Sequence, residues 1–178
     1  MTGRVLVLDF DGVVTRLEID WSYVRAKVSE TIGRRVDSLN AFWEESFGSS
    51  LFRRASALVE EYELQAVSKS RAYEDVRQAL KSFDGPVYLA SMQSGKAIDV
   101  FLNKHFLRRF FKEVLGRERF GSKERQLLYI IAGEDEGAEI VLVDDSKRNL
   151  EMCNKLGIRC ILLDRRAGGS LPSALQKG

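Results

Sequence analysis

The sequence predicts an α/β fold built on a doubly wound, parallel sheet, with a helical segment inserted after the first strand. Five short apolar runs have the character of strands, and four of them are almost continuously apolar, as is typical of strands covered on both faces. Helical patterns separate the later runs, which favours parallel crossovers. The predicted strands are Val5–Phe10, Val87–Ser91, Phe111–Leu115, Ile140–Asp144 and Cys160–Leu163.

Three helices are predicted between the later strands, at Lys96–Phe106, Lys123–Ala132 and Lys147–Leu156. We expect Ser146 to cap the amino terminus of the last helix, because its hydroxyl can accept a bond from a free N–H. Gly157 is expected to end the same helix in the left-handed conformation. This alternation of strand and helix predicts a Rossmann-like sheet.

Three apolar stripes at helical spacing lie between residues 17 and 72, where no strand pattern interrupts them, and Asp20 is a candidate N-cap for the first. We therefore expect a core of residues 1–16 and 73–178 and a helical cap of residues 17–72. Parallel α/β sheets bind ligands at the carboxyl ends of their strands, so such a cap is expected to form a lid; the alternative is that it adds only stability. We expect both tryptophans to lie in the core of the cap. The stripes are Trp21, Val24, Val28 and Ile32; Leu39, Phe42, Trp43 and Phe47; and Leu51, Ala55, Leu58, Val59 and Tyr62.

The composition, with 44% hydrophobic and 30% charged residues in a chain of 178, predicts a soluble globular protein that can bury a core. The net charge of +2 does not favour a nucleic-acid or membrane partner. A zinc site is not expected, because the chain has one histidine and its two cysteines, Cys153 and Cys160, form no CxxC pair. Lacking an apolar run of membrane length and a signal peptide, the chain is expected to be cytoplasmic, with reduced thiols. No pattern indicates an oligomeric state.

Two pairs of carboxylates stand at the ends of predicted strands. Asp9 and Asp11 point to the same side where the first strand ends, and Asp144 and Asp145 end the fourth. If these strands are neighbours, the carboxylates meet in one crevice, where their repulsion raises their pKa values. A divalent cation with oxygen ligands, such as Mg²⁺, would remove this conflict. Taken alone, each pair has a simpler explanation, a turn or a helix amino terminus.

Two further residues indicate an anionic ligand. Ser91 ends the second predicted strand, and a hydroxyl and backbone N–H groups at the entry to a helix suit a phosphate oxygen. An ordinary N-cap is the alternative for Ser91. Lys123 lies in the first turn of a predicted helix, where the dipole disfavours a cation, so an anionic partner is indicated there.

In chain order, these residues resemble the four motifs of the haloacid dehalogenase-like (HAD) superfamily of phosphohydrolases. The stretch Asp9–Thr15 is similar to the first motif, Ser91 to the second, Lys123 to the third and the pair Asp144-Asp145 to the fourth. The resemblance covers residues 1–16 and about 73–164. It is strongest to phosphoglycolate phosphatase-like members that carry a small C1-type helical cap.

The resemblance implies a Mg²⁺-dependent phosphatase that acts on a small phosphorylated metabolite. Asp9 would be the nucleophile and form an aspartyl-phosphate, which divides one difficult hydrolysis into two easier steps. Asp11 would protonate the leaving alcohol and then deprotonate the attacking water. Ser91, Lys123 and backbone N–H groups near Met92 would bind the phosphate oxygens.

For the metal, the resemblance implies the side chain of Asp9, the backbone carbonyl of Asp11 and one acid of the fourth motif. Many relatives have Gly-Asp-Ser and a later acid there, whereas this chain has Asp144-Asp145-Ser146 and then Asn149. Alignment on the Asp-Ser pair makes Asp145 the expected direct ligand and Asp144 a ligand through water.

Other functions remain open at this point. A phosphomutase or another phosphotransferase would share every one of these residues. A non-enzymatic phospho-acceptor or ligand-binding module is a third possibility, although in receiver-like domains the acidic pair precedes the acceptor aspartate and the lysine comes last. Basic residues of the cap, Arg25 among them, leave open a second anionic group on the substrate.

Overall fold

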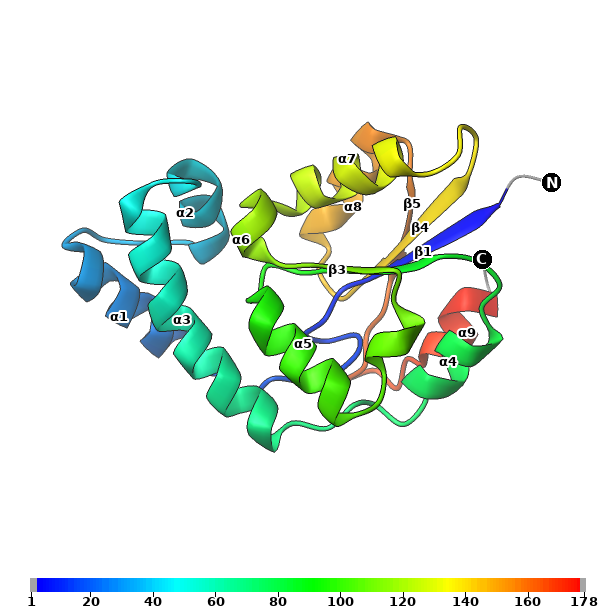
Figure 1. The fold of residues 1–178 in the computed structure, drawn as a ribbon, viewed down its shortest axis with the longest axis horizontal. Helices are drawn as coiled ribbons and strands as arrows, with labels where there is room; N and C mark the ends of the chain where they lie inside the picture. Colours follow the sequence, from blue (N-terminus) through cyan, green and yellow to red (C-terminus); the bar gives the residue numbers. More distant parts are fainter. Residues whose placement is uncertain (1–2, 177–178) are drawn as a thin grey trace.

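The structure is a computed structural model that describes residues 3–176 as a five-stranded parallel sheet with helices on both faces (Figure 1). The strand order is β3-β2-β1-β4-β5, and the predicted neighbours β1 and β4 pair from Arg4↔Glu139 to Leu8↔Val143. The predicted doubly wound α/β sheet is therefore confirmed. The strands are β1 Arg4–Leu8, β2 Val87–Ala90, β3 Glu113–Leu115, β4 Glu139–Asp144 and β5 Arg159–Leu162.

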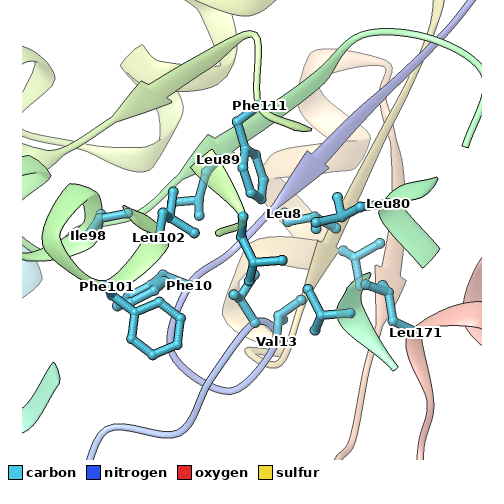
Figure 2. Packing of buried hydrophobic residues seen from close by; sticks show 14 of the residues in the cluster. Leu8, Phe10, Val13, Leu80, Leu89, Ile98, Phe101, Leu102, Phe111 and Leu171 are labelled. Carbon is cyan, nitrogen blue, oxygen red and sulfur yellow. The ribbon is translucent and has the colours of Figure 1, made fainter. Parts of the chain in front are cut away.

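Alternate residues of the central strands enter two separate hydrophobic clusters, because successive side chains of a strand point to opposite faces. In β1, Leu6 and Leu8 share a cluster with residues of α4, α5 and α9, and Figure 2 shows Leu8 in it. Val5 and Val7 belong to the second cluster, with residues of α7 and α8. These strands are buried on both sides, which explains their continuously apolar sequence. The helices are α4 Val76–Ser82, α5 Gly95–Lys104, α7 Lys123–Gly133, α8 Arg148–Leu156 and α9 Leu171–Gln176, with the short η1 Arg108–Phe110 and α6 Arg117–Phe120.

Two details of the predicted elements are wrong at their ends. The third strand begins at Glu113, because η1 precedes it and Phe111 is buried in the hydrophobic cluster before the strand starts. Ser146 does not cap α8: the helix begins at Arg148, and the residue at its N-cap position is Lys147. Gly157 ends α8 with φ 67°, as predicted.

The segment between β1 and α4 consists of three helices with a hydrophobic cluster of their own, at one end of the molecule (Figure 1). Asp20 caps the first helix by accepting a bond from the N–H of Tyr23 at 3.0 Å, as predicted. The third helix lies against α5 of the core. The helices are α1 Trp21–Ile32, α2 Leu39–Ser46 and α3 Ser50–Lys69, and we call the segment that contains them the cap.

The two chain segments that join the cap to the core lie side by side. Thr15 forms an antiparallel bridge with Ala72, and the N–H of Tyr73 donates to the carbonyl of Val14 at 3.0 Å. The cap therefore leaves and re-enters the core at one narrow point, directly after the turn that follows β1.

The last described helix packs against the core. In α9, Leu171 is fully buried, and its N–H donates to Asp75 at the start of α4 at 2.9 Å. Arg165 pairs with the same carboxylate at 2.6 Å. No helix within residues 3–176 is both long and apolar enough to cross a membrane.

Burial in the sheet can be tested with a matched pair of leucines. Leu89 in β2 is fully buried, whereas Leu128 on α7 is 47% exposed. We expect Leu89→Ala to lower the free energy of unfolding by about 2–5 kcal/mol, since it leaves a cavity in the core. Leu128→Ala should change it by less than about 0.5 kcal/mol. Urea denaturation measures both, and equal losses would contradict the packing described here.

Candidate active site

The acidic cluster forms where two neighbouring strands end. The N–H of Asp9 donates to the carbonyl of Val143 at 3.0 Å, which continues the pairing of β1 with β4 by one residue. As a result, carboxylate oxygens of Asp9, Asp144 and Asp145 lie within 4.8 Å of one another. The structure thus brings together three of the four acids singled out from the sequence. The fourth, Asp11, lines the same cavity, and its carboxylate accepts a bond from the N–H of Leu17 at 2.8 Å.

Gly12 permits the close approach of the two acidic segments. It has φ +87°, a conformation that favours glycine, and it lies in the turn in which the carbonyl of Phe10 accepts bonds from the following N–H groups. A Cβ atom at this position would lie 2.1 Å from Oδ2 of Asp145. A side chain here would displace the carboxylate of Asp145 from its place beside the first acidic pair.

Lys123 supplies the positive charge in the cluster. It is the first residue of α7, whose N-cap is Ser122. Its Nζ donates to Oδ1 of Asp9 at 2.7 Å and to the carbonyl of Ala90 at 2.5 Å, and it lies 3.4 Å from Oδ2 of Asp144. The side chain is only 10% exposed, so these interactions are weakly screened by solvent.

The cluster contains more carboxylates than cations, and most of them are largely buried. Burial raises the pKa of Asp9 to about 7; the neighbouring acids add to this rise and Lys123 opposes it. Burial and the charge of Asp144 also raise the pKa of Asp145. Burial disfavours the ammonium of Lys123, but the surrounding carboxylates outweigh this and raise its pKa. One lysine does not neutralise three carboxylates, so the site favours a further cation.

The two acids at the end of β4 have different surroundings. Asp144 is buried: its Oδ1 accepts a bond from the N–H of Ser146 and its Oδ2 accepts one from Nδ2 of Asn149, each at 2.8 Å. Asp145 is exposed beside Gly12. Both oxygens of Asp144 therefore have protein partners, whereas Asp145 is the more accessible of the two carboxylates.

The turn after β2 lies against this cluster. Ser91 is fully buried, and its hydroxyl contacts the side chain of Gln93. Ser91 is not the cap of α5, because Ser94 fills that role and accepts a bond from the N–H of Ala97 at 3.3 Å. Met92 and Gln93 line the same cavity as the acids, whereas the buried Ser91 is not among its lining residues.

The cavity has a volume of about 440 Å³ and is walled by core and cap together. Trp43 belongs to the hydrophobic cluster of the cap, as predicted, but it also lines the cavity. Trp21 is only partly buried and lines the cavity beside Asp11, whose pKa its side chain lowers. Its place next to this acid was not predicted from the sequence. The other cap residues in the wall are Arg25, Asp37, Ser38, Leu39, Asn40, Val59 and Glu63.

Arg117 and Arg148 line the cavity from the core, and this position was not predicted from the sequence. Arg117 belongs to the four-residue helix α6 and is completely buried. Its sequence context, between Gly116 and Glu118, resembles an ordinary charged surface turn. Only its fully buried contacts with the cap set it apart, and these follow from the tertiary structure.

The role of Gly12 can be tested with a pair of Gly→Ala substitutions. Gly12→Ala should lower the free energy of unfolding by about 1–3 kcal/mol through its left-handed backbone alone. The clash with Asp145 should lower it further. Gly133 ends α7 and has open space around it, so Gly133→Ala should leave stability unchanged or raise it by up to about 1 kcal/mol. Thermal and urea denaturation would detect the difference, and a stable Gly12→Ala protein would contradict the close approach.

No protein-family model matches the chain, and no curated protein matches it significantly. Solved structures do. A haloacid dehalogenase-like family hydrolase from Streptococcus pneumoniae aligns with a TM-score of 0.63 and 10% identity, over 98% of this chain and 90% of its own. A predicted phosphoglycolate phosphatase from Haemophilus somnus aligns with a TM-score of 0.62 and 16% identity, over 90% and 85%.

A third similar structure is that of YfnB from Bacillus subtilis, assigned as a HAD-hydrolase and determined bound to magnesium. It aligns with a TM-score of 0.61 and 12% identity, over 92% of this chain and 89% of its own. These identities are too low to transfer an activity, but the alignments span both the sheet and the cap. The chain therefore has the fold of the haloacid dehalogenase-like superfamily.

Proposed function

We propose that this chain is a Mg²⁺-dependent phosphatase that hydrolyses a small phosphate monoester through an aspartyl-phosphate on Asp9. The observation that carries the proposal is the contact of Asp9 with Lys123 at 2.7 Å inside a cluster of acids at the carboxyl ends of β1 and β4. Ligands of parallel α/β sheets bind at this edge. A nucleophilic carboxylate, a cation that binds phosphate oxygens and a second acid in one cavity are the parts that phosphoryl transfer requires.

Asp9 and Asp11 have separate tasks in this mechanism. A carboxylate oxygen of Asp9 forms a bond to phosphorus while the bond from phosphorus to the alcohol oxygen breaks, and Asp11 gives its proton to that oxygen. In the second step Asp11 takes a proton from water, the water oxygen bonds to phosphorus, and Asp9 is released with inorganic phosphate. Burial raises the pKa of Asp11, which favours its holding a proton for the first step.

The remaining residues bind the phosphoryl group. Lys123 is already held between Asp9 and the carbonyl of Ala90, so its ammonium needs little rearrangement to contact a phosphate oxygen. Ser91 and the backbone N–H of Met92 are at the turn after β2, next to the same cavity. Donors that are fixed before the reaction stabilise the developing charge without a cost of reorganisation.

The acidic cluster fits Mg²⁺, since its oxygens are close together and one lysine leaves them under-compensated. Asp9 and Asp145 would hold the ion with their side chains and Asp11 with its backbone carbonyl, while Asp144 would act directly or through water. When bound, Mg²⁺ screens the carboxylate from the phosphate charge. The proposal of Mg²⁺ as the cation is supported by the similar fold of YfnB, whose structure was determined bound to magnesium.

The size of the cavity supports a small substrate. A volume of about 440 Å³ beneath the cap suits a small phosphorylated metabolite and disfavours a folded phosphoprotein. Its wall combines the two indoles of Trp21 and Trp43 with the guanidinium groups of Arg25 and Arg148. The leaving group would therefore meet both apolar and basic side chains.

The nucleophile can be tested with p-nitrophenyl phosphate. We expect hydrolysis that requires Mg²⁺, stops with EDTA and falls by at least roughly 10³-fold in Asp9→Asn, because an amide is not a nucleophile here. Asp84→Asn, on an exposed loop, is the matched control and should retain wild-type activity. Absence of turnover in the wild-type protein, with a stable phosphoryl group on Asp9 from acetyl phosphate, would instead favour a phosphotransferase or a switch.

The role of Asp11 can be tested by comparing leaving groups. p-Nitrophenolate leaves without protonation, whereas glycerol from glycerol phosphate needs a proton. In Asp11→Asn we expect hydrolysis of glycerol phosphate to fall by about 10²–10⁴-fold. With p-nitrophenyl phosphate the phosphorylated enzyme should still form and then accumulate, as mass spectrometry of the intact protein would show. Equal loss with both substrates and no accumulated phosphoenzyme would contradict this role.

A further inference from the structure

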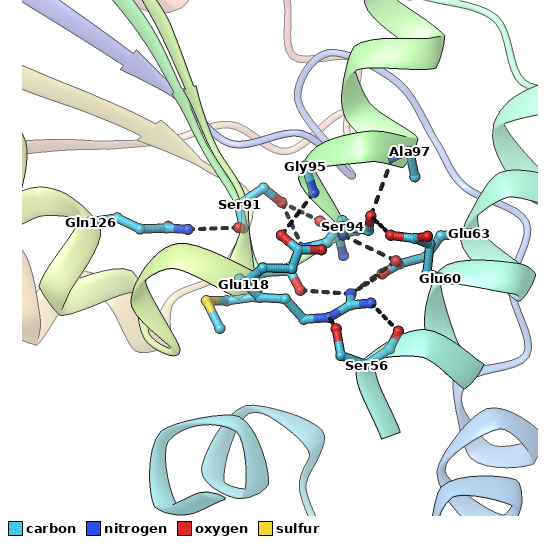
Figure 3. A network of polar contacts seen from close by, with 12 residues as sticks. Ser56, Glu60, Glu63, Ser91, Ser94, Gly95, Ala97, Glu118 and Gln126 are labelled. Carbon is cyan, nitrogen blue, oxygen red and sulfur yellow. Dashed lines mark hydrogen bonds and ion pairs between the residues drawn. The ribbon is translucent and has the colours of Figure 1, made fainter. Parts of the chain in front are cut away.

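A buried ion pair joins the core to the cap next to the proposed phosphate site. Nη1 of Arg117 donates to both carboxylate oxygens of Glu63 in α3, at 2.7 and 2.9 Å (Figure 3). Nε and Nη2 donate to the hydroxyl and the carbonyl of Ser56, each at 2.9 Å. The side chains of the pair are 0% and 1% exposed. The guanidinium also lies 5.0 Å from the ring centre of Trp43, so three cap residues surround it.

On its core side, Arg117 holds the turn that follows Ser91. Its Nη1 donates to the carbonyl of Met92 at 3.3 Å, and its backbone N–H donates to the carbonyl of Gln93 at 3.1 Å. The carbonyl of Ser91 accepts a bond from Gln126 at 2.8 Å. All three carbonyls of this turn are thus bonded on the side of α6 and α7.

These bonds fix the direction of the N–H groups in the turn. A trans peptide is planar, and its N–H points opposite to its C=O. When Gln126 holds the carbonyl of Ser91 and Arg117 holds that of Met92, the N–H groups of Met92 and Gln93 are turned to the other side. There the N–H of Gln93 makes a long bond of 3.4 Å to the hydroxyl of Ser91, which a phosphate oxygen would replace. Both of these residues line the cavity that contains Asp9.

The cap also holds the end of the same turn. Oε2 of Glu63 accepts a bond from the N–H of Ser94 at 3.0 Å, and Glu60 accepts one from the hydroxyl of Ser94 at 2.5 Å. Glu63 therefore contacts both Arg117 and the residue that caps α5. One cap carboxylate fixes the turn directly at Ser94 and indirectly through Arg117.

We propose that Arg117 is a positioning residue, which aligns the backbone of Met92 and Gln93 to bind phosphate and depends on Glu63 of the cap to do so. This inference rests on the proposed phosphatase function. Neither side chain needs to touch the substrate. Phosphate affinity in the core would then depend on a carboxylate that the cap supplies, so that a docked cap and a formed phosphate site occur together.

The test is the binding of inorganic phosphate to the full chain in the presence of Mg²⁺, measured by calorimetry, together with KM and kcat for p-nitrophenyl phosphate. Arg117→Lys keeps the charge but loses the planar fork of donors, and Glu63→Gln keeps the shape but loses the charge. In each we expect the dissociation constant for phosphate to rise about tenfold, with a parallel rise in KM. Ser56→Ala, which removes one hydrogen bond, should give a smaller rise of about threefold.

The control is Val28→Ala, in α1 and in the hydrophobic cluster of the cap, which makes no bond of the turn. It should lower the melting temperature but leave the phosphate dissociation constant at the wild-type value, with all proteins assayed below their melting transitions. The double variant Glu63→Gln with Arg117→Gln should bind phosphate better than the product of the effects of Glu63→Gln and of Arg117→Gln, each measured alone, predicts, because no unpaired charge is left buried.

Two results would overturn the inference while the proposed function stands. One is wild-type phosphate affinity in the folded variants at positions 117, 63 and 56. The other is an equal loss of affinity in Val28→Ala, which would make the effect one of general cap stability. A wild-type protein that neither hydrolyses p-nitrophenyl phosphate nor binds phosphate would overturn the proposed function itself, and the inference with it.

Discussion

Repulsion among carboxylates at the carboxyl ends of β1 and β4 is the constraint on which the rest of the site depends. The parallel pairing of these strands brings Asp9 next to Asp144 and Asp145, and burial makes their charges costly. Lys123 lies in the cluster because it is the first residue of α7, after the N-cap residue Ser122, and its Nζ contacts Asp9. Unbalanced negative charge of this kind favours a bound cation, as the proposed function requires.

The cap supplies residues to the site as well as covering it. Its helices supply Trp21 next to Asp11 and Glu63 next to Arg117, so residues of the cap contact two different parts of the core site. A buried ion pair adds little to stability by itself, because desolvation offsets most of the attraction. Loss of either partner leaves an unpaired buried charge, which is costly. The cap is therefore favoured in the arrangement that keeps Arg117 and Glu63 together.

Two candidate caps named from the sequence are not the residues at the N-cap positions of the helices that follow them. Ser146 precedes α8, but the helix begins at Arg148 and its N-cap is Lys147. Ser91 is followed by a second serine, and Ser94 is the one whose hydroxyl meets the free N–H of α5. Sequence patterns identify candidate caps, whereas the tertiary contacts of each side chain decide which is used.

The sheet, the helices on its two faces and the inserted helical segment could be predicted from the sequence. So could the acids and the lysine that the structure brings together. These follow from apolar periodicity and from residues that stand next to strand ends, both of which are local properties of the chain. The residues that line the cavity and the pairing of Arg117 with Glu63 could not be predicted from the sequence, because they depend on tertiary contacts. Those residues lie 54 positions apart and meet because two separately formed clusters pack together, and a charged side chain that will be buried has no local pattern that distinguishes it from one exposed to water.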